Sequence, residues 1–208
     1  LDGRGLDISA VHLAHSYERV MPGENYLESI THFWRVYAGI TLRAADTCEA
    51  FLSTIIDVER YPLARLSSTT ASETAKLMEN TYRAANIAFI DEWTKYSETI
   101  GIDLHEIIDA IRVRPTHSNI RFPGIGVGGY CLTKDPAFVP AAARQIFAKP
   151  DLEFPFSLLS LKINQAMPLH AVNRLKIFLG NKFQGKNVML LGVSYRQDIG
   201  DTRHSPVE

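Results

Sequence analysis

A cysteine at position 131 follows a run of glycines and precedes a lysine and an aspartate, in the segment GIGVGGYCLTKDP that spans residues 124–136. A thiol attacks as its thiolate, which a nearby lysine or a turn of inward-pointing backbone amides favours. Glycines let such a turn approach a bound anion closely, and the segment has four of them: Gly124, Gly126, Gly128 and Gly129. The segment therefore predicts a nucleophilic Cys131, with Lys134 and the glycines contacting the substrate.

Three of these glycines also spell the GxGxxG pattern of dinucleotide-binding proteins. That pattern binds a pyrophosphate only where it follows a buried strand and opens a helix. Here Arg121-Phe122-Pro123 precedes it, and no helix is expected before residue 136. The pattern is therefore rejected as a dinucleotide site, and the true fingerprint is absent from the 208 residues.

A second set of polar side chains falls on one face of a long predicted helix. Glu73, Lys76 and Asn80 occur at i, i+3 and i+7, with mostly apolar residues between them. At helical spacing they share a face, and a lysine beside an asparagine on a half-buried face can orient a substrate or a water. The helix alone favours the other interpretation, a solvated stripe with a Glu–Lys pair.

Residues 1–69 are expected to form the C-terminal part of an α/β domain, the first of the elements that would position these residues. Residues 1–30 are expected to be irregular. Three regular elements are expected after them: a strand over Arg35–Ile40, a helix over about 42–56 capped by Thr41, and an extended piece near Leu63–Ser67. This order is typical of an α/β domain. Cys48 lies on the apolar face of the helix and is interpreted as a structural residue.

Residues 70–180 are expected to form an all-α central domain. The capping box Thr70-Ala-Ser-Glu73 opens a helix that continues to Ile100 without proline or glycine, and Gly101 ends it. Three further helices are expected: Leu104–Arg112, Pro136–Phe147, and Phe156–Leu179 with a break or kink at Pro168. A helix of thirty residues with apolar side chains beyond one face predicts a homodimer through residues 70–100.

Residues 181–208 are expected to begin another α/β domain. Lys186–Tyr195 predicts a buried strand of a parallel sheet, because Val188–Leu191 is a continuous apolar run. The sequence starts with Leu1 rather than methionine, and the first α/β domain lacks its front. We therefore expect the chain to be part of a longer protein.

Composition limits the partners. The 22 Lys+Arg residues against 23 Asp+Glu give a net charge of -1, which provides no bulk attraction to nucleic acid or to an anionic membrane. No apolar run approaches the ~20 residues that span a bilayer, and the seven histidines form no metal-binding motif. Two cysteines far apart suggest no disulfide framework, so no membrane, no metal and a cytoplasmic setting are expected.

Four segments, in order, resemble the UDP-glucose/GDP-mannose dehydrogenase family. They are Tyr17–Gly23 (YERVMPG), Glu73–Glu92 (ETAKLMENTYRAANIAFIDE), Gly124–Pro136 (GIGVGGYCLTKDP) and Leu191–Pro206 (LGVSYRQDIGDTRHSP). Members of that family are NAD-dependent nucleotide-sugar 6-dehydrogenases of polysaccharide biosynthesis, which oxidise a C6 hydroxyl to a carboxylate with two NAD in succession. The resemblance implies an NAD-binding Rossmann-like domain that ends here, a central domain on a dimer-forming helix, and a C-terminal Rossmann-like domain that starts here and helps hold the nucleotide-sugar.

The resemblance also implies a role for each matching residue. Cys131 is at the position of the nucleophile that holds the sugar as a thiohemiacetal and then as a thioester. Lys76 matches the lysine that stabilises oxyanions or works with a water, and Asn80 matches the asparagine that polarises the reacting oxygen. Four more residues match family positions: Asp135, which orients lysine and water; Glu18, implicated in thioester hydrolysis; Arg196, a lysine in many members, at the substrate; and Arg203, at the cofactor or nucleotide.

Three positions depart from the family pattern. Thr133 and Tyr17 replace prolines, and His117 lies about where many members have an arginine that reaches across the dimer. The ERVMPG form of residues 18–23 resembles members that act on N-acetylated hexosamines, whereas Lys134 and the aspartate after it resemble members that use glucose or mannose. The resemblance therefore implies a UDP-sugar, either a UDP-N-acetylhexosamine or UDP-glucose.

Two other functions compete with this one. A two-electron hydroxyacid or 6-phosphogluconate-type dehydrogenase also joins a Rossmann domain to a helical domain with a Lys/Asn helix face, but it lacks a nucleophilic cysteine after a glycine turn. A non-catalytic helical dimerisation module would explain the long helix but not the segment around Cys131. Because the sequence has no dinucleotide fingerprint, the 208 residues alone are expected to be inactive.

Overall fold

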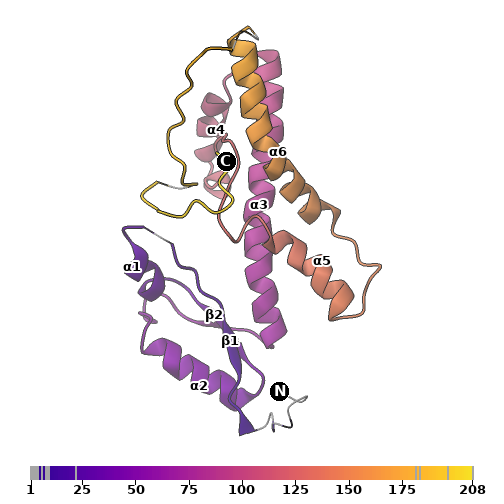
Figure 1. The fold of residues 1–208 in the computed structure, drawn as a ribbon. Helices are drawn as coiled ribbons and strands as arrows, with labels where there is room; N and C mark the ends of the chain where they lie inside the picture. Colours follow the sequence, from indigo (N-terminus) through magenta and orange to yellow (C-terminus); the bar gives the residue numbers. More distant parts are fainter. Residues whose placement is uncertain are drawn as a thin grey trace. The chain divides into compact units, whose positions relative to one another are not determined.

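The computed structural model describes residues 5, 7, 10–21, 23–180, 182, 184–195 and 197–207. The chain divides into two compact units, residues 1–76 and residues 77–208 (Figure 1). Each unit is considered by itself below, because each holds a different part of the predicted site.

The first unit is a three-stranded sheet with a helix packed on it. β1 (Ala14–Ser16) pairs antiparallel with β2 (Val36–Gly39), which pairs parallel with β3 (Ala64–Arg65). Between β2 and β3 the chain forms α2 (Leu42–Ser53), which packs against β2 (Figure 1). The predicted strand, helix and extended piece are therefore confirmed as one parallel β–α–β unit.

Close packing in this unit explains two sequence features. A Cβ on Gly39 would lie 2.3 Å from the backbone nitrogen of Ala45, so only glycine lets α2 start this close to β2. Thr41 caps α2 as predicted, since its hydroxyl accepts the N–H of Ala44 at 3.1 Å. Cys48 packs against the buried cluster around Tyr37, and burial raises the pKa of its thiol.

The prediction that residues 1–30 are irregular is wrong in two places. β1 lies in this stretch, and so does α1 (Tyr26–Thr31). β1 exists because its backbone pairs with β2, where Ala14 lies opposite Gly39. Such a pairing between distant residues leaves little trace in the local pattern of three side chains.

The long helix α3 (Thr69–Ile100) has the predicted end but not the predicted start. The hydroxyl of Ser68 accepts the N–H of Ala71 at 3.1 Å, so Ser68 caps the helix and the capping box predicted at Thr70 is wrong by two residues. At the other end Gly101 adopts a φ of 77°, and its N–H bonds to the carbonyl of Ser97 at 2.9 Å.

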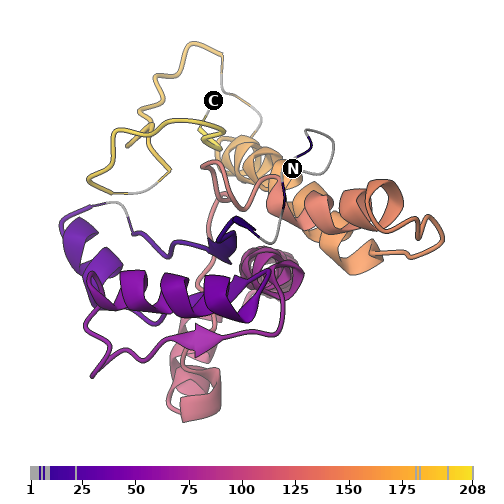
Figure 2. The same cartoon turned by 90° about the horizontal axis from the view of Figure 1, so that it is seen from below.

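The second unit is helical throughout its regular part. After α3 the described residues form four further helical segments: α4 (Leu104–Arg112), the 3-10 turn η3 (Pro115–His117), α5 (Asp135–Gln145) and α6 (Pro155–Phe178). Ile90 of α3 packs with Leu104 and Ile108 of α4, and α5 packs against α6 (Figure 2). The three predicted helices are confirmed, and Pro168 lies inside α6. None of the helices in the described residues is long and apolar enough to cross a membrane.

The strand predicted over Lys186–Tyr195 is wrong. This segment forms no strand, and the side chains of Val188–Leu191 are 53–87% exposed. A strand needs a neighbour that takes up its N–H and C=O groups, and no segment among the described residues pairs with this one. The chain as a whole keeps the expected architecture, an α/β part followed by an all-α central part.

Candidate functional site

Cys131 lies in the turn that starts α5. Its carbonyl accepts the N–H of Lys134 at 3.2 Å and the N–H of Asp135 at 2.9 Å, so Cys131 opens the turn that leads into the helix. The thiol is free and partly exposed. The position therefore combines a fixed backbone with a thiol that a ligand can reach.

A buried carboxylate is held directly after this turn. Asp135 is 5% exposed; its Oδ1 accepts from Lys134 Nζ and its Oδ2 accepts from Asn80 Nδ2, both at 2.7 Å. Asn80, on α3, is 4% exposed, so the solvated stripe considered for this helix face does not hold at this residue. The carboxylate also sits at the positive end of α5. The structure thus brings Asn80, Lys134 and Asp135 together beside the backbone of Cys131.

The Lys134 ammonium is further fixed by aromatic rings. It lies 4.5 Å from the ring centroid of Tyr130 and 4.4 Å from that of Phe138. Both distances are in the range of cation–π attraction. Lys134 therefore presents a positive charge at a set position next to the thiol-bearing turn.

The glycine-rich loop is crowded by other parts of its own unit. A Cβ on Gly128 would lie 2.6 Å from the carbonyl oxygen of His204, and a Cβ on Gly129, whose φ is 81°, would lie 2.8 Å from the ring of Tyr195. Gly124, by contrast, has no described neighbour within 4 Å of such a Cβ. The close approach that Gly128 and Gly129 permit is used here by Tyr195 and His204.

A side chain of α6 holds the same loop. Asn164 Oδ1 accepts the N–H of Val127 at 2.8 Å, and Asn164 Nδ2 donates to the carbonyl of Val127 at 2.9 Å. Gly126, with a φ of 112°, would bring a Cβ to 3.3 Å from the backbone oxygen of Asn164. The two-point hydrogen bond fixes the loop about four residues before Cys131.

The C-terminal segment adds a cation to this region. The N–H of Gly129 donates to the carbonyl of Arg203 at 2.8 Å. The guanidinium of Arg203 lies 5.4 Å from the ring centroid of Tyr130 and forms hydrogen bonds of 2.8 and 2.7 Å with Asp201. These bonds lower the pKa of Asp201 to about 2. Arg196, also predicted at the substrate, lies outside the described residues.

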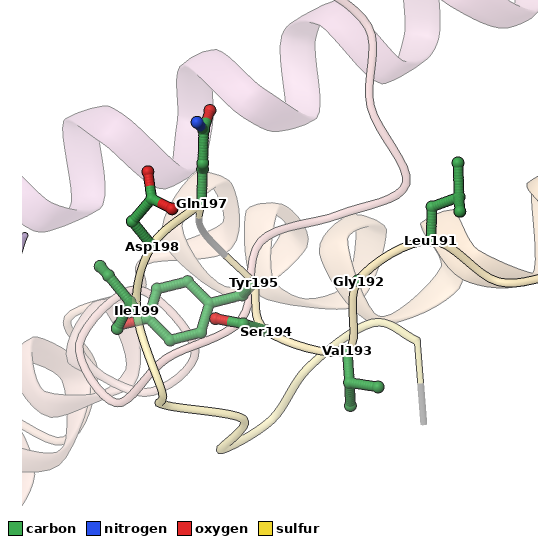
Figure 3. Close-up of a pocket in the computed structure, with 8 residues that line it drawn as sticks. All are labelled: Leu191, Gly192, Val193, Ser194, Tyr195, Gln197, Asp198 and Ile199. Carbon is green, nitrogen blue, oxygen red and sulfur yellow. The ribbon is translucent and has the colours of Figure 1, made fainter.

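Two hollows adjoin these segments. One of about 360 Å³ is lined by residues of the loop, α6 and the C-terminal segment, among them Thr133, Lys134, Asn164 and Ser205. The other, of about 610 Å³, is open and is formed by residues 191–195 and 197–199 (Figure 3). The first hollow combines polar side chains with the walls of the thiol-bearing loop, which is the composition that a polar substrate would need.

The remaining predicted pair, Lys76 and Glu18, lies in the first unit. Lys76 Nζ donates to the backbone oxygen of Glu18 at 3.0 Å and to its Oε1 at 3.3 Å. Lys76 and Asn80 are one turn apart on α3. The partner of Lys76 is therefore Glu18 rather than the Glu73 of the predicted helix stripe.

Several residues that shape the site were missed from the sequence. Asn164 holds the loop from 37 residues away, Tyr195 covers Gly129, and Arg35 binds the loop that carries Glu18. In the sequence, Asn164 is marked only by its place, because it is a polar residue four positions before Pro168 within a predicted helix. Tyr195 and Arg35 lack such a signal, because their contacts depend on the fold.

The described residues do not match a bound dinucleotide or metal. No helix begins within Gly124–Gly129 and no strand leads directly into it, and the β2–α2 turn carries no GxGxxG pattern. The pyrophosphate of NAD has no strand–glycine–helix turn in this part of the chain. Among the described residues, no group of three His, Cys, Asp or Glu side chains could hold a metal ion.

Comparison with known proteins identifies the chain's relatives. Residues 70–165 match the sequence profile described as UDP-glucose/GDP-mannose dehydrogenase family, central domain. The UDP-N-acetyl-D-mannosamine dehydrogenase of Methanocaldococcus jannaschii is 35% identical over 198 residues, covering 95% of this chain and 43% of the relative. An NDP-N-acetyl-D-galactosaminuronic acid dehydrogenase of Ralstonia solanacearum is 30% identical over 204 residues, covering 95% of this chain and 44% of that protein.

A solved structure gives the same result. The UDP-D-ManNAc dehydrogenase of Pyrococcus horikoshii superposes with a TM-score of 0.77 and 31% identity, over 93% of this chain and 44% of that one. The chain thus spans less than half the length of the relatives it matches. Residues 70–165 thus match the central domain of the UDP-glucose/GDP-mannose dehydrogenase family, and the similar sequences and the structure that shares the fold are nucleotide-sugar dehydrogenases.

Proposed function

We propose that this chain contributes the nucleophile and its surrounding polar groups to an NAD-dependent nucleotide-sugar 6-dehydrogenase. The observation that carries the proposal is the buried Asn80–Asp135–Lys134 network attached to the backbone turn of Cys131. A carboxylate can be buried only where donors satisfy it, and here two donors hold it in the turn that carries the partly exposed thiol.

In the proposed reaction the C6 carbon of the sugar loses two hydrides in turn, its hydroxyl loses a proton in the first oxidation, and the carbon gains one oxygen from water. NAD would supply the hydride acceptor. The Sγ of Cys131 adds to the intermediate C6 aldehyde, which forms a C–S bond and leaves an oxyanion. After the second oxidation the carbon is a thioester, and attack by water breaks the C–S bond, releasing the carboxylate and the thiol.

The surrounding side chains fit the charge changes of these steps. Lys76 and Asn80 are proposed to stabilise the oxyanions, since fixed donors act strongly where water is excluded. Asp135 is proposed to orient lysine and water, and Glu18 to assist the water that hydrolyses the thioester. Gly124, Gly126, Gly128, Gly129, Lys134 and Arg196 are proposed at the substrate, and Arg203 at the cofactor or nucleotide.

The central test uses the two cysteines of the chain as a matched pair. In active protein that contains this chain, Cys131→Ser is expected to reduce carboxylate formation by at least about 1000-fold, because the covalent intermediate cannot form. Cys48→Ser is expected to keep nearly full activity, because Cys48 packs against the core of the first unit. Carboxylate is measured by mass spectrometry, and two NADH per sugar are expected. Equal loss in both variants, or one NADH per sugar, would contradict the proposal.

For the sugar we propose a UDP-N-acetylhexosamine, with UDP-glucose as the alternative. Curated relatives of this chain are UDP-N-acetyl-D-mannosamine and NDP-N-acetyl-D-galactosaminuronic acid dehydrogenases, at 30–35% identity for the two compared above. Kinetics on a panel of UDP- and GDP-sugars tests this choice: a larger kcat/KM for UDP-glucose than for every N-acetylated sugar would reverse it. We place the activity in the cytoplasm, which would keep both thiols reduced.

The 208 residues alone are proposed to lack dehydrogenase activity. Hydride transfer requires the acceptor to be held close to C6, and the sequence has no strand–GxGxxG–helix unit to hold NAD. The purified chain is mixed with NAD and nucleotide-sugars, and NADH absorbance is followed. Sustained turnover that Cys131→Ser abolishes would show that NAD binds to these residues in another way.

We further propose that α3 forms a two-fold homodimer interface. Its second half exposes Phe89, Trp93 and Tyr96, which are 47–52% exposed. Aromatic side chains gathered on one helix are typical of a subunit interface. Light scattering at micromolar concentration should give twice the chain mass, and Trp93→Glu should shift the protein toward monomer. A wild-type monomer with α3 intact would refute the interface.

A further inference from the structure

Tyr17, the first residue after β1, is surrounded by three cationic side chains. It is 5% exposed, and its ring centroid lies 5.6 Å from Lys76 Nζ and 5.2 Å from the guanidinium carbon of Arg19. Its phenol oxygen accepts from Arg19 Nη2 at 2.9 Å, and its carbonyl accepts from Arg35 Nη1 at 3.3 Å. The ring is therefore within cation–π range of two positive charges, and its hydroxyl also accepts a hydrogen bond from one of them.

Glu18 follows Tyr17 and takes its position from the same contacts. One carboxylate oxygen, Oε2, accepts the N–H of Val20 at 2.6 Å, and the other accepts from Lys76 at 3.3 Å. The Lys76 ammonium also holds the backbone oxygen of Glu18. Because Lys76 lies over the ring of Tyr17, a shift of that ring would move both members of the Glu18–Lys76 pair.

Arg35 ties this loop to the rest of the first unit. It lies just before β2, is 8% exposed, and donates through Nη2 to the carbonyl of Ile30 at 3.3 Å. Its Nε has no hydrogen-bond partner among the described residues. Burial lowers the pKa of the guanidinium, while the charge of Glu18 acts in the opposite direction. Burial of a cation carries a desolvation penalty that its bonds must offset, so we take the two carbonyl bonds of Arg35 as evidence for a role in fixing the loop.

We propose that Tyr17 and Arg35 are positioning residues that hold the Glu18 carboxylate against the Lys76 ammonium. The inference rests on the proposed roles of Glu18 and Lys76 in the reaction. Neither Tyr17 nor Arg35 needs to touch the substrate. Without the ring or the clamp on the Tyr17 carbonyl, the loop keeps its sequence but loses the fixed position of its carboxylate, and hydrolysis of the thioester slows.

The test uses Tyr17→Leu and Arg35→Met, each with a matched control in the same unit. Tyr26→Leu and Arg60→Met are the controls, since Tyr26 is 49% exposed and the Arg60 side chain is 77% exposed. The first measurement is hydrogen exchange at the amide of Val20, which donates to Glu18. Exchange is expected to be about tenfold faster in the two variants, corresponding to about 1.4 kcal/mol, and unchanged in the controls.

The second measurement is turnover by active protein that contains this chain. In both variants kcat is expected to fall about tenfold with KM unchanged, because positioning for one chemical step is lost while binding is kept. The fraction of protein carrying a sugar thioester on Cys131, read by intact mass, is expected to rise. General loosening of the fold would lower kcat without accumulating the thioester.

The outcomes separate the clamp from the proposed function. Unchanged hydrogen exchange at the Val20 amide in both variants overturns the proposal that Tyr17 and Arg35 position Glu18, whatever the turnover. Faster exchange with unchanged kcat overturns its role in catalysis. A wild-type protein that makes no carboxylate contradicts the proposed function, and the exchange measurement then decides the clamp alone. Tyr17 is more deeply buried than Arg35, so Tyr17→Leu is more prone to misfold. If it does not fold, both measurements are made on Arg35→Met.

Discussion

Replacing Asn80 with aspartate puts two carboxylates in contact inside the second unit. In the wild-type protein Asn80 Nδ2 donates to Asp135 Oδ2 at 2.7 Å, and both residues are buried. In Asn80→Asp the donor becomes a like charge. Two unit charges about 4 Å apart repel by about 4 kcal/mol at an effective dielectric constant near 20. The pair can avoid this cost only by binding a proton.

Proton binding limits the loss of stability and makes it depend on pH. Holding a proton on a carboxyl group whose ordinary pKa is near 4 costs about 4 kcal/mol at pH 7. The variant is therefore expected to lose up to about 4 kcal/mol of unfolding free energy at pH 7. A shared proton raises a carboxyl pKa in the folded variant above its unfolded value, so this loss grows as pH rises from about 4 and shrinks to about 1 kcal/mol or less at pH 4.

Urea unfolding at pH 4, 5.5 and 7 measures this dependence. A Trp34→Phe background leaves Trp93 on α3 as the only tryptophan, so its fluorescence reports the second unit. All proteins are compared at one concentration. Asn86→Asp is the control, because the Asn86 amide donates within its own helix, to the carbonyl of Tyr82, and a change within about 0.5 kcal/mol is expected there. A loss under about 1 kcal/mol at pH 7, or an equal loss at pH 4 and pH 7, would refute the buried contact with Asp135.

Three further changes test individual features. Burial and the hydrogen bond to Glu49 raise the pKa of Tyr37 to about 12, so unfolding free energy should fall by up to about 2.7 kcal/mol between pH 10 and 12; a Tyr37→Phe protein with the same decline would contradict this. Gly129→Ala should cost about 1–3 kcal/mol through its φ of 81° and its contact with Tyr195, and Tyr195→Ala in the same chain should recover part of that loss in urea unfolding. Ser68→Ala should lower the free energy of unfolding by about 1 kcal/mol, whereas Thr70→Ala should change it by less than about 0.5 kcal/mol. A larger loss in Thr70→Ala than in Ser68→Ala would show that Thr70 caps the helix.

The sequence predicted the elements whose signals are local. The strand before Thr41, the helix capped by it, and the helix that ends at Gly101 depend on neighbouring residues, and all three are present. β1 was missed because its backbone bonds go to β2, more than twenty residues away. The strand predicted over Lys186–Tyr195 failed for the related reason that an apolar run cannot supply its own pairing partner.

The same distinction applies to the site. Cys131, Lys134 and Asp135 share one short segment, so their proximity was predictable. The bond from Asn80 to Asp135 joins residues 55 positions apart, and the face of α3 alone pointed to a solvated stripe instead. Only the fold could show that Asn80 is buried against that carboxylate.

Pro168 within α6 has a consequence for anyone who would stabilise this protein. A proline inside a helix removes one amide hydrogen and costs about 3 kcal/mol, so Pro168→Ala is an obvious engineering choice. The carbonyl that Pro168 leaves without a helical donor belongs to Asn164, the residue whose side chain holds Val127 and whose carbonyl Gly126 approaches. A restored amide would draw that carbonyl back into the helix and away from the loop before Cys131. The variant would then have a more stable helix and a less firmly held loop, so higher thermal stability would come with a less accurately placed Cys131 thiol.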